Sequence, residues 1–132
     1  MRYLLDTNII IAAMKGDARV RARLETTPLS EIVLSPVVLG ELEHGVEKSQ
    51  QQEKNSARLA RIVEGMHLAP LDAEASRRYG AIRTELERKG TPIGANDYWI
   101  AAQALAMDAV LVTNNIGEFS RVPGLTVEDW LG

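Results

Sequence analysis

Four acidic side chains lie where the predicted fold brings separate chain segments together, and they are the residues best placed to do chemistry. Asp6 follows the first predicted strand, Glu41 lies on the helix after the second, Asp97 opens a later helix, and Glu118 lies in the loop after the fourth strand. Asp6 directly follows an apolar segment that predicts a buried strand, and an acid in that place either caps a turn or lines a ligand crevice. Asp97 stands in the first turn of a helix that is apolar nearly all round, so its carboxylate is expected to face a crevice.

Carboxylates that gather in one place need a proton or a cation. Two of them 4 Å apart repel by roughly 4 kcal/mol at an effective dielectric constant near 20. The chain has no cysteine and only two histidines, His44 and His67, neither of which is expected to be a ligand. Oxygen ligands favour Mg²⁺ or Mn²⁺. Such an ion suits the hydrolysis of a phosphodiester bond.

The elements that position these acids alternate between strand and helix. Short apolar strands are expected at 3–5, 32–34, 68–71, 109–112 and 125–127, with Pro70 placing the third at a sheet edge. Helices are expected at 7–14, 18–26, 37–47, 73–89 and 97–107, capped by Thr7 or Asn8, Asp17, Ser35, Asp72 and Asn96 in turn, and a further helical stripe is expected over 59–66. The polar run 48–56 is expected to be a solvated helix-hairpin connection. This order predicts a three-layer α/β/α fold in one domain, 1–132, with a mostly parallel central sheet of about five short strands.

Composition narrows the class of protein further. The chain has 132 residues and a formal net charge of −3, so any contact with nucleic acid must come from local basic patches or through a metal. No apolar run approaches the roughly 18 residues of a membrane span. The absence of cysteine and of a recognisable targeting segment leads us to expect a cytoplasmic protein without membrane contact.

Several short motifs, in order along nearly the whole chain, resemble those of the PIN domain, and specifically of VapC-type ribonuclease toxins. The motifs are Asp6-Thr7-Asn8, Glu41-Leu42 with Gly45, Pro92-Ile93-Gly94, Asp97, Ile100-Ala101-Ala102, Leu111 to Asn115, Glu118-Phe119, Val122 to Leu125 and Glu128-Asp129-Trp130. Each motif is weak alone, and their combination is specific.

The resemblance implies a site for one or two Mg²⁺ or Mn²⁺ ions and cleavage of single-stranded RNA. The RNA would be a tRNA, and the closest-looking toxins cut initiator tRNA in its anticodon region. It also implies a homodimer and a cognate VapB-like antitoxin whose tail reaches into the active site. By position, Asp6 and Asp97 would hold the metal, and Glu41 would be a further ligand or would position water. Asn8, Thr113 and Asn115 would support these groups.

One position departs from the commonest pattern of the family. Many PIN domains have an aspartate shortly after the Ser/Thr that ends the fourth strand, where this chain has Asn114 and Asn115. We expect Glu118 to replace that acid; otherwise the second metal binds weakly or not at all. The alternative is a catalytically silent PIN-type domain that only binds RNA or protein.

Two other classes fit the sequence less well. A receiver-like domain needs an acidic pair after the first strand and a lysine after the last, and both are missing. A metal phosphatase would need an Asp-x-Asp nucleophile motif, which is also missing. Arginines on the helices, namely Arg19, Arg21, Arg23, Arg77, Arg78, Arg83 and Arg88, either contact phosphates or solvate their helices, and Tyr98 and Trp99 either stack on a base or pack internally.

Overall fold

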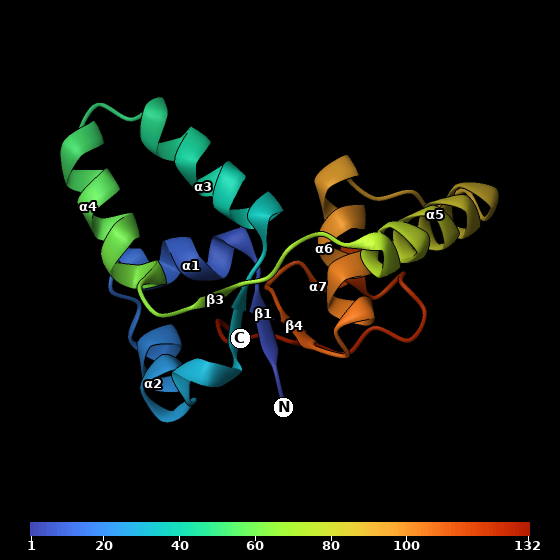
Figure 1. Ribbon diagram of the computed structural model, residues 1–132, viewed down its shortest axis with the longest axis horizontal. Coiled ribbons are helices and arrows are strands. Elements are labelled where there is room, and N and C mark those ends of the chain that lie inside the picture. Colours follow the sequence, from blue (N-terminus) through green and yellow to red (C-terminus); the bar gives the residue numbers. More distant parts are fainter.

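The centre of the molecule is a parallel sheet with the strand order β3-β2-β1-β4-β5. The computed structural model describes residues 1–132 (Figure 1). The strands are β1 (Tyr3–Leu5), β2 (Ile32–Leu34), β3 (His67–Leu68), β4 (Val110–Val112) and β5 (Val127–Glu128). All four strand pairings are parallel, which confirms the predicted sheet. All five carboxyl ends therefore point to one edge of the sheet.

Helices enclose this sheet on both sides. They are α1 (Thr7–Met14), α2 (Ala18–Thr26), α3 (Pro36–Glu47), α4 (Gln52–Val63), α5 (Ala73–Arg88), α6 (Ala95–Ala106) and the short α7 (Ile116–Phe119), with a 3-10 turn at Leu29–Glu31. Helices α1 and α4 pack together on one side, and α5 and α6 pair on the other (Figure 1). The predicted three-layer architecture is thus present.

Side-chain caps set most of the helix starts. Asp17, Ser35 and Asp72 cap α2, α3 and α5 as expected. For α1 the prediction was wrong, because the cap is Asp6 itself, whose carboxylate accepts the N–H of Thr7. Helix α6 begins at Ala95, two residues earlier than predicted, and Asn96 lies inside it instead of capping it.

Several connections also differ from the prediction. Helix α4 starts at Gln52, so only the segment 49–51 separates it from the C-cap of α3, and much of the polar run is helical. Strand β3 lies at the sheet edge as expected but ends at Leu68, before Pro70, which has no N–H to donate. Glu118 lies on α7, not in a loop.

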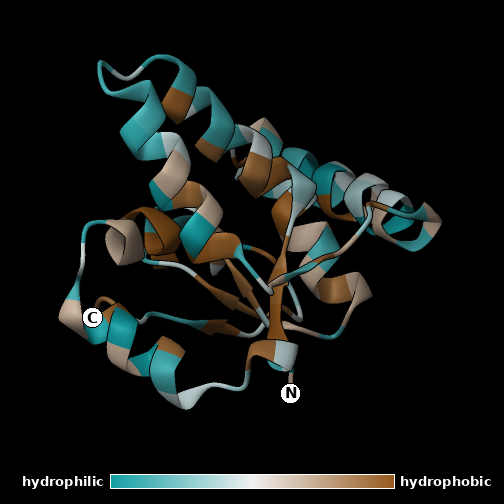
Figure 2. Cartoon of the chain, turned by 60° about the vertical axis from the view of Figure 1, so that its left-hand side comes forward, coloured by the Kyte–Doolittle hydropathy of each residue, from teal (hydrophilic) through white to brown (hydrophobic).

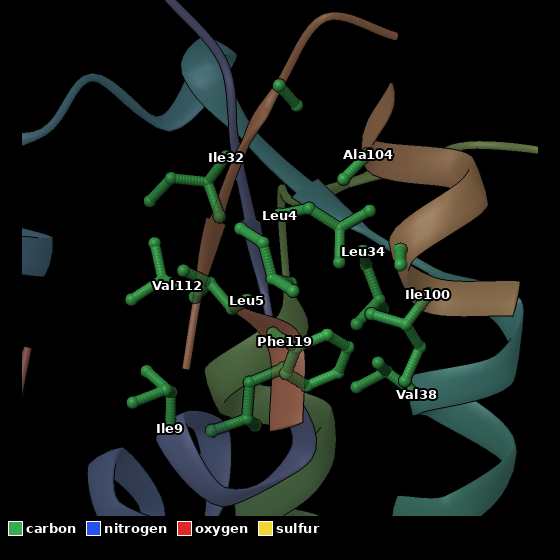
Figure 3. Packing of buried hydrophobic residues seen from close by; sticks show 14 of the residues in the cluster. Leu4, Leu5, Ile9, Ile32, Leu34, Val38, Ile100, Ala104, Val112 and Phe119 are labelled. Carbon is green, nitrogen blue, oxygen red and sulfur yellow. The ribbon is translucent and has the colours of Figure 1, made fainter. Parts of the chain in front are cut away.

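The apolar core lies between the sheet and its helices. Figure 3 shows Leu4 and Leu5 of β1 packed among Ile100 of α6 and Phe119 of α7, all of them fully buried. Figure 2 shows the same separation at the scale of the chain, with hydrophobic strands inside and hydrophilic stretches on the outer helices. Helix α6 is central, as its composition predicted. None of the helices combines the length and apolarity that crossing a membrane requires.

Candidate active site

The site forms where β1 and β4 end side by side. Leu5 pairs with Val112 in parallel register, and the N–H of Asp6 donates to the carbonyl of Val112 at 2.8 Å. The next residue of each strand, Asp6 and Thr113, therefore meets the other at the carboxyl edge of the sheet. This is the crevice position that open α/β sheets use for ligands.

Both oxygens of Asp6 are held in place. Oδ1 accepts the Thr7 N–H at 2.8 Å, and Oδ2 accepts the hydroxyl of Thr113 at 2.7 Å. The residue is only 6% exposed. Burial raises the pKa of the Asp6 carboxyl, the two hydrogen bonds oppose that rise, and the charges of Glu41 and Glu118 add to it.

Glu41 approaches from α3. Its Oε1 accepts the hydroxyl of Thr7 at 2.8 Å, which joins the first turn of α1 to α3. Thr7 thus uses its N–H for Asp6 and its hydroxyl for Glu41. This role of Thr7 was not predicted, although a hydroxyl next to the candidate ligand Asp6 could have indicated it.

Asp97 and Glu118 form a carboxyl pair. Burial and then the neighbouring Glu118 raise the pKa of Asp97 to about 7, and the charges of Asp6 and Glu41 push it in the same direction. Asp97 therefore takes up a proton more readily than an ordinary aspartate, beside a Glu118 whose pKa is lowered. All four predicted acids are close enough to influence one another electrostatically.

The carboxylate of Glu118 lies at the N-terminal end of α6 and accepts a backbone hydrogen bond there. The N–H of Gly94 donates to its Oε1 at 2.6 Å, and Nδ2 of Asn115 donates to its Oε2 at 2.7 Å. Burial raises the pKa of Glu118, but hydrogen bonds from Gly94, Asp97 and Asn115 together with the charge of Arg121 lower it more. An anion at a helix N-terminus is also favoured by the helix dipole.

Gly94 leaves room for this pair. A methyl group on Gly94 would lie 3.0 Å from Oδ2 of Asp97 and 3.6 Å from Oε1 of Glu118. Its φ of −61° is ordinary, so this glycine serves close approach and not an unusual backbone. The sequence placed Gly94 in a family-like motif but gave it no role, because its role depends on a chain segment 24 residues away.

The other predicted residues divide between the site and the packing around it. Asn8 donates to Oδ1 of Asn114 at 3.4 Å and contacts none of the four acids through that bond. Tyr98 is buried, and its hydroxyl accepts the N–H of Ile93. Trp99 stacks on Tyr79 of α5 with ring centroids 4.0 Å apart, so it packs internally.

The donor set fits a hard divalent cation. The polar groups at the site are carboxylate, hydroxyl and amide oxygens, and the raised pKa of Asp97 marks the place where a cation would relieve repulsion. No group of three or more acidic or histidine side chains forms a closed ligand cluster. Mg²⁺ sites commonly use only one or two protein carboxylates plus water.

Comparison with known proteins agrees with this geometry. Residues 3–125 match the PIN domain model. Ribonuclease VapC2 of Rickettsia felis is 42% identical over 132 residues, and the tRNA(fMet)-specific endonuclease VapC of Salmonella typhimurium is 39% identical over 133, with 98% of both chains covered in each case.

Solved structures give the same answer. The chain is similar to VapBC2 of R. felis bound to a promoter DNA fragment, with a TM-score of 0.92 and 42% identity over 98% of this chain and 99% of that one. DNA-bound VapBC of S. typhimurium gives a TM-score of 0.93 and 38% identity over 98% of both chains. The chain therefore belongs to the PIN domain family, and VapC ribonucleases are among its full-length relatives.

Proposed function

We propose that this protein is a metal-dependent endoribonuclease toxin of the VapC type that cleaves tRNA and is neutralised by a VapB-like antitoxin. The observation that carries the proposal is the carboxyl pair of Asp97 and Glu118 beside Asp6 and Glu41, at the edge where β1 and β4 end. Carboxyl groups crowded in this way are relieved either by a proton or by a divalent cation. The names of the full-length relatives support ribonuclease activity.

In this proposal Asp6 and Asp97 hold Mg²⁺ or Mn²⁺. Such an ion, when bound, polarises the phosphoryl oxygen and makes an attacking water more acidic. Thr113 keeps the carboxylate of Asp6 oriented through its 2.7 Å hydrogen bond. Glu41, fixed by Thr7, orients the water, and Glu118 is kept ionised by Gly94 and Asn115 so that it can accept a proton.

The substrate and partners follow from the relatives. Two of them are named for tRNA(fMet), so we propose a tRNA as substrate, and initiator tRNA cut in its anticodon region as the first to test. Cleavage there would stop translation. Solved VapBC complexes support a VapB-like antitoxin as partner, and we propose a homodimer as the form that binds it.

The test is cleavage of purified total tRNA with Mg²⁺, with EDTA, and by Asp6→Ala and Asp97→Asn proteins prepared in parallel. Discrete fragments that require both the metal and the two aspartates are the expected result, and their mapped ends give the target. Cleavage that persists in either variant would contradict the assigned metal ligands. Absence of cleavage by folded, antitoxin-free wild-type protein in Mg²⁺ and Mn²⁺ would favour the binding-only alternative.

A further inference from the structure

A hollow between α1, α2 and α4 gathers arginines that have no acidic partner. Arg21 of α2 and Arg58 and Arg61 of α4 line it together with Met14 and Ile62, and its volume is about 220 Å³. We call this the arginine hollow. Helices α2 and α4 both pack against α1 (Figure 1). This packing is what places the three arginines around one hollow.

The three arginines are free to bind an anion. None of them forms an ion pair, whereas Arg77 and Arg78 of α5 are both paired with Glu74 of their own helix. All three are exposed. Arg21 and Arg61 also border a neighbouring hollow that contains Glu25, and that carboxylate is not within ion-pair distance of either. The arginine hollow is therefore a concentration of positive charge on a chain whose net charge is −3.

The arginine hollow shares two lining residues with a second hollow that includes one acid of the active site. Arg58 and Met14 also line a second hollow of about 270 Å³, between α1, α3 and α4, whose far side includes Glu41. Lys15, another cation without an ion pair, lines this connecting hollow. The two neighbouring hollows thus have linings that together include an acid of the site and three unpaired guanidinium groups.

This arrangement suits a phosphate chain. The acids of the active site repel a polyanion, so affinity for RNA must come from cations nearby. Guanidinium groups bind phosphate oxygens through two parallel hydrogen bonds. We propose that the arginine hollow holds backbone phosphates of the RNA strand whose scissile phosphate lies at the acids. This rests on the proposed ribonuclease function and extends it, because it names the surface that holds the flanking nucleotides.

The first test is the salt dependence of RNA binding by Asp97→Asn protein, in which cleavage is disabled. A short labelled single-stranded RNA is titrated by fluorescence anisotropy between about 50 and 200 mM salt. Loss of both phosphate contacts in Arg58→Ala/Arg61→Ala should weaken binding by roughly ten- to a hundredfold. It should also reduce the slope of log Kd against log salt by about 0.7 for each contact.

Two variants control for charge and folding. Arg77→Ala/Arg78→Ala removes the same net charge from α5 and should leave the salt slope unchanged. Arg58→Lys/Arg61→Lys keeps the charge and should keep most of the slope. Thermal unfolding of each variant reports whether the fold is intact, and exposed arginines on α4 are expected to tolerate the change.

The second test is kinetic and uses the proteins without the Asp97 change. Arg58→Ala/Arg61→Ala should raise KM for a long RNA and leave kcat for a minimal oligonucleotide unchanged. An unaltered salt slope and KM would overturn the inference while wild-type cleavage upheld the nuclease. A loss confined to binding of the VapB-like antitoxin would also overturn it, because the hollow would then belong to that protein. Failure of wild-type protein to bind or cleave any RNA would instead remove the proposed function itself.

Discussion

The hydroxyl of Thr113 donates to Oδ2 of Asp6 at 2.7 Å and joins the ends of two neighbouring parallel strands through a buried carboxylate. The same hydroxyl accepts the N–H of Asn115 at 3.0 Å, which starts the turn into α7. One side chain thus orients a proposed metal ligand and the segment that carries Glu118.

Replacement of Thr113 by valine should therefore lower both stability and activity. The variant keeps the shape of the side chain but leaves a buried carboxylate and a backbone N–H each short of one partner. A loss of roughly 1–3 kcal/mol in the free energy of unfolding is expected. Chemical denaturation measures it, and Thr113→Ser, which retains the hydroxyl, is the control. Equal stability of the valine and serine variants would contradict the proposed role.

Stability should depend on pH through Asp97. Its pKa is about 7 in the folded protein against an ordinary value of 3.8, so between about pH 4 and pH 7 the folded state keeps a proton that the unfolded chain has released. The free energy of unfolding should then fall as pH rises through this window in EDTA. The raised pKa of Asp6 acts in the same direction. The lowered pKa of Glu118 has the opposite effect, but only below about pH 4.5.

Melting temperatures in EDTA at several pH values test this expectation. Asp97→Asn should flatten the decline, and Mg²⁺ should raise the melting temperature of the wild type more at pH 8 than at pH 5. The matched control is Asp108→Asn, an exposed site near the opposite edge of the sheet whose φ of 53° suits asparagine. If Asp97→Asn and wild-type protein lost stability equally with rising pH, the Asp97 assignment would be wrong.

Glu118 should matter more for cleavage than Asn115. Removing Asn115 takes away one of two hydrogen bonds to Glu118 and leaves that from Gly94 intact. Asn115→Ala is thus expected to reduce cleavage by about ten- to a hundredfold, as is usual for groups that hold a ligand in place. Glu118→Ala should reduce cleavage further, since the charge of the carboxylate itself is lost. Comparison of kcat for the two variants on one RNA checks the order, and the reverse order would exclude Glu118 as the replacement acid.

Gly94→Ala should impair cleavage while the fold persists. The added methyl group would lie 3.0 Å from Oδ2 of Asp97, closer than ordinary packing allows, so the carboxyl pair has to move. Gly80→Ala is the matched control, because its added methyl group meets nothing within 4 Å. Far-ultraviolet circular dichroism and cleavage rates measured together separate the two effects. Full activity in Gly94→Ala would show that the pair tolerates displacement.

Local signals predicted most of the fold. Apolar segments and side-chain caps located all five strands and the starts of α2, α3 and α5 to within a few residues, although the last strand lies at Val127–Glu128 instead of 125–127. Parallel pairing then placed Asp6 beside Thr113, because both follow neighbouring strands. The third strand ends at Leu68, before Pro70, because proline has no backbone N–H to donate to a neighbouring strand.

Non-local contacts account for what was missed. The local sequence predicted Asn96 as the capping residue of α6. The backbone N–H at this helix end donates instead to Glu118, which lies 24 residues beyond Gly94. The sequence did not identify Arg58 and Arg61 as candidate phosphate contacts, because isolated arginines in a polar helix are common and indicate no binding site by themselves. Only the packing of α4 on α1 and α2 makes them neighbours of Arg21.

The strand order has a consequence for the synthesis of the protein on the ribosome. β1 needs β4 as its neighbour, and the bond between Asp6 and Thr113 spans 107 residues of a 132-residue chain. A nascent chain that already displays Asp6 and Glu41 therefore lacks Thr113 and Glu118 until translation is almost finished. Because domains fold as units, prematurely terminated fragments of this nuclease should be harmless to the cell that makes them. The complete set of site residues exists only after the last fifth of the chain has been synthesised.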